Sequence, residues 1–211
     1  MRRACDLRHR SVELHEHFLR HILGVGVLSR ESQGDAERAI LMQEDELADD
    51  ALRVVGPSNL HITLAFLGYL PEKEIAAVAV VVNRISRAAP QIGFVREPAR
   101  KPKGRPRIFA LEAVSEETIA LQADLEGELA QQHLYKPEKR PFWPHVTIAR
   151  VRPERRGSKR PARVRRVPER LPDVLLQPFF AVGVTLYRSV LRPQGAEYAP
   201  LAQVELPAHK T

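Results

Sequence analysis

Two short stretches of the sequence, NLHITLAFLG and FWPHVTIARV, each carry a histidine, an aliphatic residue, a threonine and a second aliphatic residue. The first contains His61 and Thr63, and the second contains His145 and Thr147. Because an imidazole titrates near neutral pH, one such ring can accept a proton while another donates one. A threonine hydroxyl can donate a hydrogen bond to a phosphate oxygen. These four side chains, brought together, would suit acid–base chemistry on a phosphodiester.

Each stretch is expected to be a β-strand, in which successive side chains point to opposite faces. His61 and Thr63 then share one face, and His145 and Thr147 share another. The residues of the opposite faces are apolar and are expected to face the core: Leu60, Ile62, Leu64 and Phe66 in the first strand, Val146 and Ile148 in the second. A single His-x-Thr motif in a strand is usually accidental. The presence of two such motifs is the reason for the hypothesis that they share one active site.

The elements around the two motifs indicate an α+β fold. Residues 71–89 are predicted to form a helix that begins at a proline and has two glutamates in its first turn. Residues 115–134 form the clearest predicted helix, with Ser115 as the N-cap and leucines spaced four apart. Further strands are predicted at residues 91–97, 107–114, 179–191 and 200–206. Helices mixed with adjacent strands favour antiparallel sheets.

Residues 1–50 are expected to form a divergent N-terminal segment within the same single domain as residues 51–211. Helical spacing is present at residues 11–23 and 34–52, and residues 23–29 could form a short strand. His17 and His21 would lie four apart on the first of these helices, which is a possible metal pair. A solvated helix face is the simpler interpretation.

Composition describes a soluble globular protein in a reducing compartment. The chain has 211 residues, of which 44% are hydrophobic and 28% charged, and Cys5 is its single cysteine. No secretory signal and no apolar run long enough to cross a bilayer is visible, so the protein is expected to be cytoplasmic. The net charge is +7, and much of the excess of basic residues lies in residues 96–107 and 150–166, two stretches with prolines that are expected to be loops. They are either solvated surface or a footprint for RNA.

The motifs HITL and HVTI resemble the paired His-x-Thr motifs of the 2H phosphoesterase superfamily. Their surroundings, NLHITLAFLG, RPFWPHVTIARV and VTLYRSVLRPQGAEYAPL, resemble the bacterial RNA 2′,3′-cyclic phosphodiesterases, which have also been called 2′-5′ RNA ligases. The resemblance covers residues 52–206. It implies two pseudo-symmetric lobes of antiparallel sheet with flanking helices around a central cleft. It also implies opening of RNA 2′,3′-cyclic phosphate ends to 2′-phosphates, without metal or cofactor.

The resemblance also implies roles for single residues. His61 and His145 would be the acid–base pair, and Thr63 and Thr147 would hold the phosphate. Arg150 matches the family's arginine that contacts phosphate. Strict alternation places Arg150 on the face opposite His145, so the strand must end or contain a bulge for Arg150 to reach the cleft.

Some points stay open at the level of sequence. The family's usual first strand has no match in residues 1–50, and either residues 23–29 replace it or the start is divergent. Trp143 could stack on a base or simply pack beside the cleft, and Tyr187 and Arg188 could be structural or could face the substrate. The alternatives to the hydrolase are a non-catalytic RNA-binding module and another 2H activity, such as 2′-5′ RNA ligation or hydrolysis of a small cyclic nucleotide. A monomer is expected.

Overall fold

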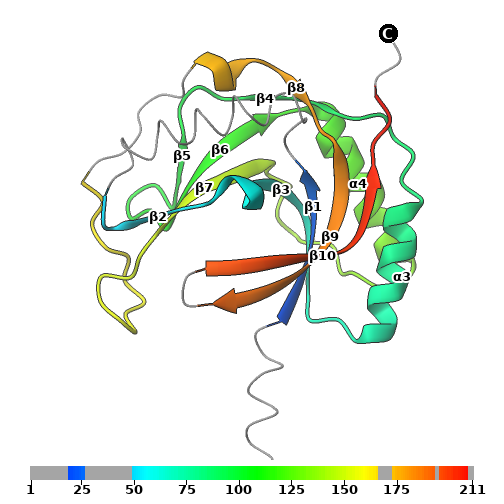
Figure 1. Ribbon diagram of the computed structural model, residues 1–211, viewed down its shortest axis with the longest axis horizontal. Helices are drawn as coiled ribbons and strands as arrows, with labels where there is room; N and C mark the ends of the chain where they lie inside the picture. The colour runs from blue at the N-terminus through cyan, green and yellow to red at the C-terminus, as the bar shows by residue number, and fades with distance from the viewer. Residues whose placement is uncertain (1–18, 27–48, 166–172, 193–194, 209–211) are drawn as a thin grey trace, which may run out of the picture.

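The computed structural model describes residues 19–26, 49–165, 173–192 and 195–208 (Figure 1). Two α-helices are described, α3 (Glu72–Asn83) and α4 (Glu116–Gln131), with short 3-10 turns at Pro57–Asn59 and Asp173–Leu176. The strands are β1 (Leu19–Gly26), β2 (Leu52–Val54), β3 (His61–Gly68), β4 (Gln91–Phe94), β5 (Ala99–Lys101), β6 (Ile108–Val114), β7 (His145–Val151), β8 (Phe179–Phe180), β9 (Gly183–Arg192) and β10 (Gly195–Glu205).

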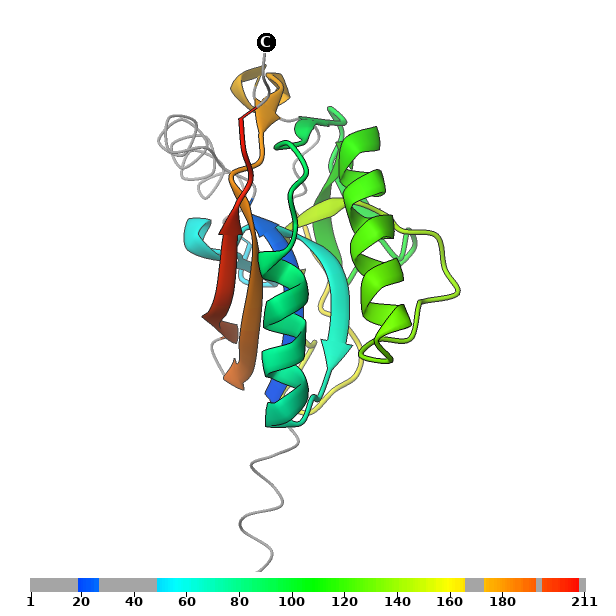
Figure 2. The same ribbon diagram turned by 90° about the vertical axis from the view of Figure 1, so that its right-hand side faces the viewer.

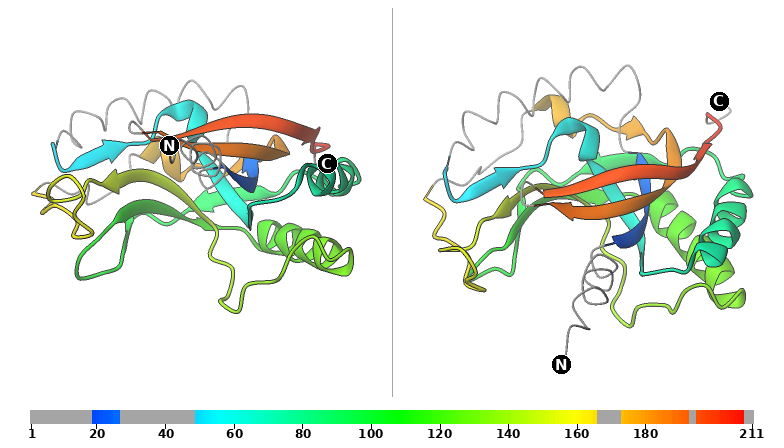
Figure 3. Two further views of the ribbon diagram at one scale, coloured as in Figure 1. Left: turned by 90° about the horizontal axis from the view of Figure 1, so that it is seen from below. Right: turned by 60° about the horizontal axis from the view of Figure 1, so that its bottom comes forward.

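The strands form one antiparallel sheet with two halves. Their order is β10-β9-β1-β3-β7-β6-β4-β8, with β2 paired to β7 and β5 paired to β6. The two motif strands, β3 and β7, lie next to each other at the centre, and their ladder consists of the single pair Ile62 and Val146. Seen from below, β9 and β10 lie over β6 and β7, so the sheet is strongly curved (Figure 3, left). The predicted α+β fold with two lobes of antiparallel sheet is confirmed.

The helices cover the outer face of the sheet, side by side (Figure 2). Helix α4 begins as predicted, because the Ser115 hydroxyl accepts a hydrogen bond from the Thr118 backbone N–H at 3.1 Å. Its buried stripe is the predicted one, Leu121, Leu125 and Leu129. Helix α3 starts directly after Pro71, carries two glutamates in its first turn and buries three valines, Val78, Val81 and Val82.

The core lies between these helices and the apolar face of β3, β6 and β7. Ile62 and Leu64 of β3 are buried, as are Val146 and Ile148 of β7, so most of the predicted core face is confirmed. The largest fully buried side chain is Phe109 of β6. β3 ends at Gly68, whose φ of 72° lies in the left-handed region that glycine adopts without steric cost.

A β-bulge in β3 makes one core prediction wrong. Thr63 and Ala65 pair with consecutive residues of β1, so Leu64 has no partner of its own. Both Leu64 and Ala65 are buried, and the alternation reverses after them. Phe66, predicted to face the core, is therefore 40% exposed.

The N-terminal half of the first lobe differs from the sequence prediction. Residues 19–23 belong to strand β1 and not to a helix, and β1 lies between β3 and β9. The short strand expected at residues 23–29 thus begins four residues earlier, and its part beyond Gly26 lies outside the described residues. His21 lies in this strand and not on a helix, and His17, the other member of the possible metal pair, is outside the described residues. The helix predicted over residues 34–52 lies outside the described residues up to residue 48, and Leu52 starts β2.

The two basic segments lie next to each other at one end of the sheet, left in Figure 1. The first is mostly loop, as predicted, but also contains the edge strand β5. The second runs as loop after β7 as far as it is described. The Arg107 guanidinium donates a hydrogen bond to the Lys159 carbonyl at 3.2 Å, and the Val151 N–H donates to the Arg107 carbonyl at 2.9 Å. In the described part of the chain, neither helix has the length and apolar character needed to span a bilayer.

Candidate active site

His61 is the first residue of β3, and its ring is held from two sides. Its Nδ1–H donates to the backbone carbonyl of Asn59 at 2.8 Å. The Tyr198 ring meets it edge-on with centroids 5.1 Å apart, and the Tyr187 ring lies at 6.0 Å. Because a carbonyl can only accept, Nδ1 carries the hydrogen and Nε2 is left for proton exchange.

His145 is the first residue of β7 and is held in the corresponding way. Its Nδ1–H donates to the backbone carbonyl of Trp143 at 2.7 Å. The Trp143 ring also stacks on the imidazole, with centroids 4.0 Å apart and planes 16° from parallel. The Lys101 ammonium lies 4.6 Å from the centre of the same indole ring, at cation–π distance.

The register of the two strands brings these rings together. Ile62 and Val146, the residues that follow the two histidines, are direct partners across β3 and β7. Continuing this antiparallel pair outward by one residue places His61 opposite Thr147 and Thr63 opposite His145. All four of these side chains are half-buried, while their neighbours in the strands are buried. The four residues predicted from the two motifs therefore lie together on one surface.

Burial and nearby cations lower the pKa of both imidazoles, so the neutral form of each ring prevails at neutral pH. The pKa of His61 is lowered, first by burial and then by Arg150 and His145, against the raising effect of its carbonyl partner. The pKa of His145 is also lowered, first by burial and then by Arg150 and Lys101, while its carbonyl partner and Glu112 raise it. His145 contributes to the lowered pKa of His61, and Arg150 contributes to the lowered pKa of both histidines, so the three groups lie within electrostatic reach.

Arg150 reaches the cleft through a bulge, as its predicted role requires. Thr147 and Ala149 pair with consecutive residues of β6, which leaves Ile148 without a partner. Ile148 and Ala149 are both buried, and after them Arg150 is exposed on the face of His145. β3 contains its bulge at the corresponding position, so the two lobes share this local geometry as well.

Arg53 is a site residue that the sequence analysis missed. It pairs with Arg150 across β2 and β7, and Arg150 pairs with Ile108 of β6, which pairs in turn with Lys101 of β5. Direct partners in antiparallel strands point to the same face, so three cations form a row on the cleft surface. The pKa of Arg53 is lowered by burial first and then by neighbouring arginines, and is raised by Tyr198.

The open assignments around the cleft are partly decided. Trp143 contacts His145, so it is part of the site. Tyr187 lies near His61, whereas Arg188 follows it in β9 and points to the opposite face. Within the described residues, no three histidine, cysteine or carboxylate side chains gather as a metal site would need.

Several known proteins are similar to this chain in sequence or in fold. An RNA 2′,3′-cyclic phosphodiesterase from Thermus thermophilus is 33% identical over 160 residues, 72% of this chain and 74% of that protein. One from Methanocaldococcus jannaschii is 26% identical over 158 residues, 74% of this chain and 85% of that protein. A crystal structure of a Thermus thermophilus protein, 27% identical, superimposes with a TM-score of 0.70 over 90% of this chain and 100% of that one.

The fold alone is shared with E. coli LigT complexed with 3′-AMP, which is 21% identical and superimposes with a TM-score of 0.66 over 90% of this chain and 98% of that one. A family model described as the 2′-5′ RNA ligase superfamily matches residues 37–174. The resemblance noted in the two His-x-Thr motifs is thus confirmed, and the chain belongs to the 2′-5′ RNA ligase superfamily of 2H phosphoesterases.

Proposed function

We propose that this protein hydrolyses RNA 2′,3′-cyclic phosphate ends to 2′-phosphomonoesters, without metal, by acid–base catalysis from His61 and His145. The observation that carries the proposal is the pairing of Ile62 with Val146, which brings together two imidazoles that each donate from Nδ1 to the carbonyl two residues earlier. Both histidines come from one chain, so a monomer suffices.

In the proposed reaction a water molecule attacks the cyclic phosphorus. One imidazole, neutral at Nε2, takes a proton from the water as the new P–O bond forms. The other, protonated at Nε2, gives its proton to the ribose 3′ oxygen as the P–O3′ bond breaks. The products are a 2′-phosphomonoester and a free 3′ hydroxyl, and each proton-transfer group can contribute about 10²–10⁴-fold to the rate.

The remaining cleft residues would hold the phosphate. Thr63 and Thr147 would donate hydrogen bonds to its non-bridging oxygens. Arg150 and Arg53 carry fixed positive charge on the same face and would stabilise the charge that develops on those oxygens. The fixed Nδ1–H bonds keep each Nε2 in one tautomeric role, which is the pre-organisation that proton transfer needs.

The test is to incubate the protein with an RNA ending in a 2′,3′-cyclic phosphate and to identify the phosphomonoester by chromatography against 2′- and 3′-phosphate standards. A 2′-phosphate end is expected. A 3′-phosphate end would contradict the proposed leaving group. Tight binding without turnover would favour the RNA-binding module, and a 2′-5′-linked product with an added 5′-hydroxyl RNA would favour ligation.

A further inference from the structure

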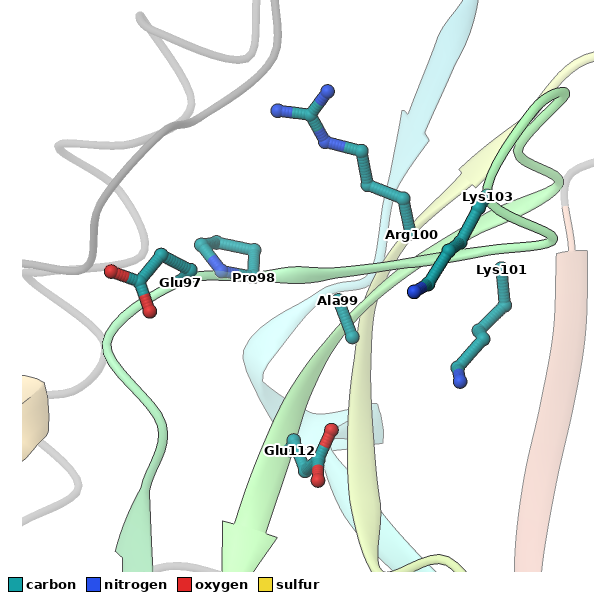
Figure 4. A pocket seen from close by; sticks show the side chains of 7 residues that line it. All are labelled: Glu97, Pro98, Ala99, Arg100, Lys101, Lys103 and Glu112. Atoms are coloured by element: carbon teal, nitrogen blue, oxygen red, sulfur yellow. The ribbon is translucent and has the colours of Figure 1, made fainter.

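A pocket on the second lobe has no assigned ligand in the proposed reaction. Its volume is about 510 Å³, within the range of small-molecule sites (Figure 4). Three basic residues line it, Arg100, Lys101 and Lys103, together with the carboxylates of Glu97 and Glu112 and the small side chain of Ala99. Strand β5, the loop after it and the neighbouring strand β6 therefore build a mostly cationic hollow.

The pocket adjoins the candidate active site. Glu112 is the direct partner of His145 across β6 and β7. Lys101 contacts the Trp143 ring, which stacks on the His145 ring. Glu112 is thus on the strand next to His145, and Lys101 is separated from His145 only by the Trp143 ring. A single nucleotide bound at His145 could therefore extend into the pocket.

The sheet register connects the pocket to the proposed phosphate position. Ala99 pairs with Ala110 across β5 and β6, and Ala110 pairs with Thr147 across β6 and β7. These three residues form one row on the cleft face. In Figure 4 the Lys103 side chain points from the loop back toward β5. Ala99 of the pocket is thus two strands away from Thr147, the threonine proposed to hold the cyclic phosphate.

The charges of the pocket match a single phosphodiester. Three cations against two carboxylates leave a net charge of +1. Arg100, Lys101 and Lys103 are exposed, and no carboxylate in the described ranges lies within ion-pair distance of any of them. Basic side chains that have no carboxylate partner among the described residues and that line a cavity favour an anionic ligand.

We propose that this pocket binds the phosphodiester that joins the cyclic terminal nucleotide to the nucleotide before it. The inference rests on the proposed function. It implies that the enzyme prefers an oligoribonucleotide substrate to a mononucleotide. The RNA strand then leaves the cleft over the hairpin of β5 and β6, where the two basic segments lie next to each other.

The test compares kcat/KM for a dinucleotide and a mononucleotide, each ending in a 2′,3′-cyclic phosphate, over a range of salt concentrations. We expect the dinucleotide to be preferred at low salt. The slope of log kcat/KM against log salt should be steeper for the dinucleotide by about 0.7, the value for one phosphate contact on a single strand. A mononucleotide with an added 5′-phosphate should recover much of the preference. Equal efficiencies at low salt, or no gain from the 5′-phosphate, would overturn the proposal.

The variant Lys103→Met tests the pocket directly. It should bring the ratio of dinucleotide to mononucleotide efficiency toward one and remove the difference in salt slope. Lys73→Met is the matched control, because Lys73 is exposed on α3, on the other side of the molecule (Figure 1). An unchanged ratio in Lys103→Met, or a parallel loss on both substrates, would overturn the assignment. If the unaltered protein opened neither substrate, the proposed function itself would fail, which is a different result.

Discussion

Ile62 of β3 and Val146 of β7 are direct partners in the antiparallel sheet, and each follows one of the two motif histidines. The pair lies near the pseudo-twofold axis that relates the two lobes, because the two strands show the same structural features on either side of it. Each histidine donates from Nδ1 to the carbonyl two residues before it, and each strand contains a bulge directly after its threonine. Duplicated local geometry of this kind brings two imidazoles with the same tautomer together on one surface.

The first prediction concerns the two histidines. His61→Ala and His145→Ala should each lower turnover of a cyclic phosphate by at least about 10²-fold, the contribution of one acid–base group. Because the pair acts as a unit, the double variant should be little slower than either single variant. Half-buried cleft residues carry little core packing, so the melting temperature should change modestly. Near-native turnover in either single variant with unchanged melting would rule out the proposed pair.

The pH dependence provides a second prediction. The pKa values of both imidazoles are lowered from the ordinary value of 6.5, so both rings lose their protons below that pH. At neutral pH the histidine that acts as the base is then mostly in the neutral form that it needs. The histidine that acts as the acid is protonated in only a minority of the molecules. We expect a bell-shaped profile of kcat/KM, which reports the free enzyme, with its alkaline midpoint below 6.5. An alkaline midpoint above that value would contradict the effect of burial on the two rings.

Lys101 offers a way to assign the limbs of that profile. Its charge lowers the pKa of His145 and is not among the causes of the shift at His61. In Lys101→Met the pKa of His145 should therefore rise, and only the limb that belongs to His145 should move to higher pH. Movement of the alkaline limb would make His145 the acid, and movement of the acidic limb would make it the base. A downward shift, or no shift of either limb, would contradict the electrostatic role of Lys101.

Much of the site follows from local sequence, because strand alternation depends on neighbouring residues. The faces of His61 and His145, the N-cap at Ser115 and the helical leucine stripe needed no knowledge of distant strands. Phe66 was misplaced because a bulge depends on the register with the partner strand, which the motif strand does not encode by itself.

Long-range pairing also explains the two larger misses. Residues 19–23 have helical spacing, but β1 pairs with strands on both sides, and these two ladders of hydrogen bonds prevail over a weak local preference. Arg53 could not be identified from its neighbours in sequence, since only its pairing with Arg150 brings it to the cleft.

Replacing Arg53, one of the cations in this row, should have opposite effects on activity and on stability. Arg53 and Arg150 are like charges on direct partners, an unfavourable arrangement that a bound phosphate would relieve. Arg53→Met should lower kcat/KM by about 10²-fold, the effect of removing one preorganised donor. The variant should nevertheless melt at the same or a higher temperature without ligand, and added phosphate should raise its melting temperature less than that of the unaltered protein. Arg188→Met, on the far face of β9, is the control, and equal losses in the two variants would argue against a specific phosphate contact.

The same cations lead to the prediction about metal. Hydrolysis of a cyclic phosphate needs proton transfer at two oxygens and positive charge near the non-bridging oxygens. In the proposed mechanism His61 and His145 perform the transfers, and Arg53 and Arg150 provide the charge that a divalent ion provides in other phosphoesterases. Turnover measured after dialysis against excess chelator should therefore equal that of the untreated protein, and added magnesium or manganese should not increase it. Loss of turnover on chelation that a divalent ion restores would show that the arginines do not suffice and would overturn the metal-independent mechanism.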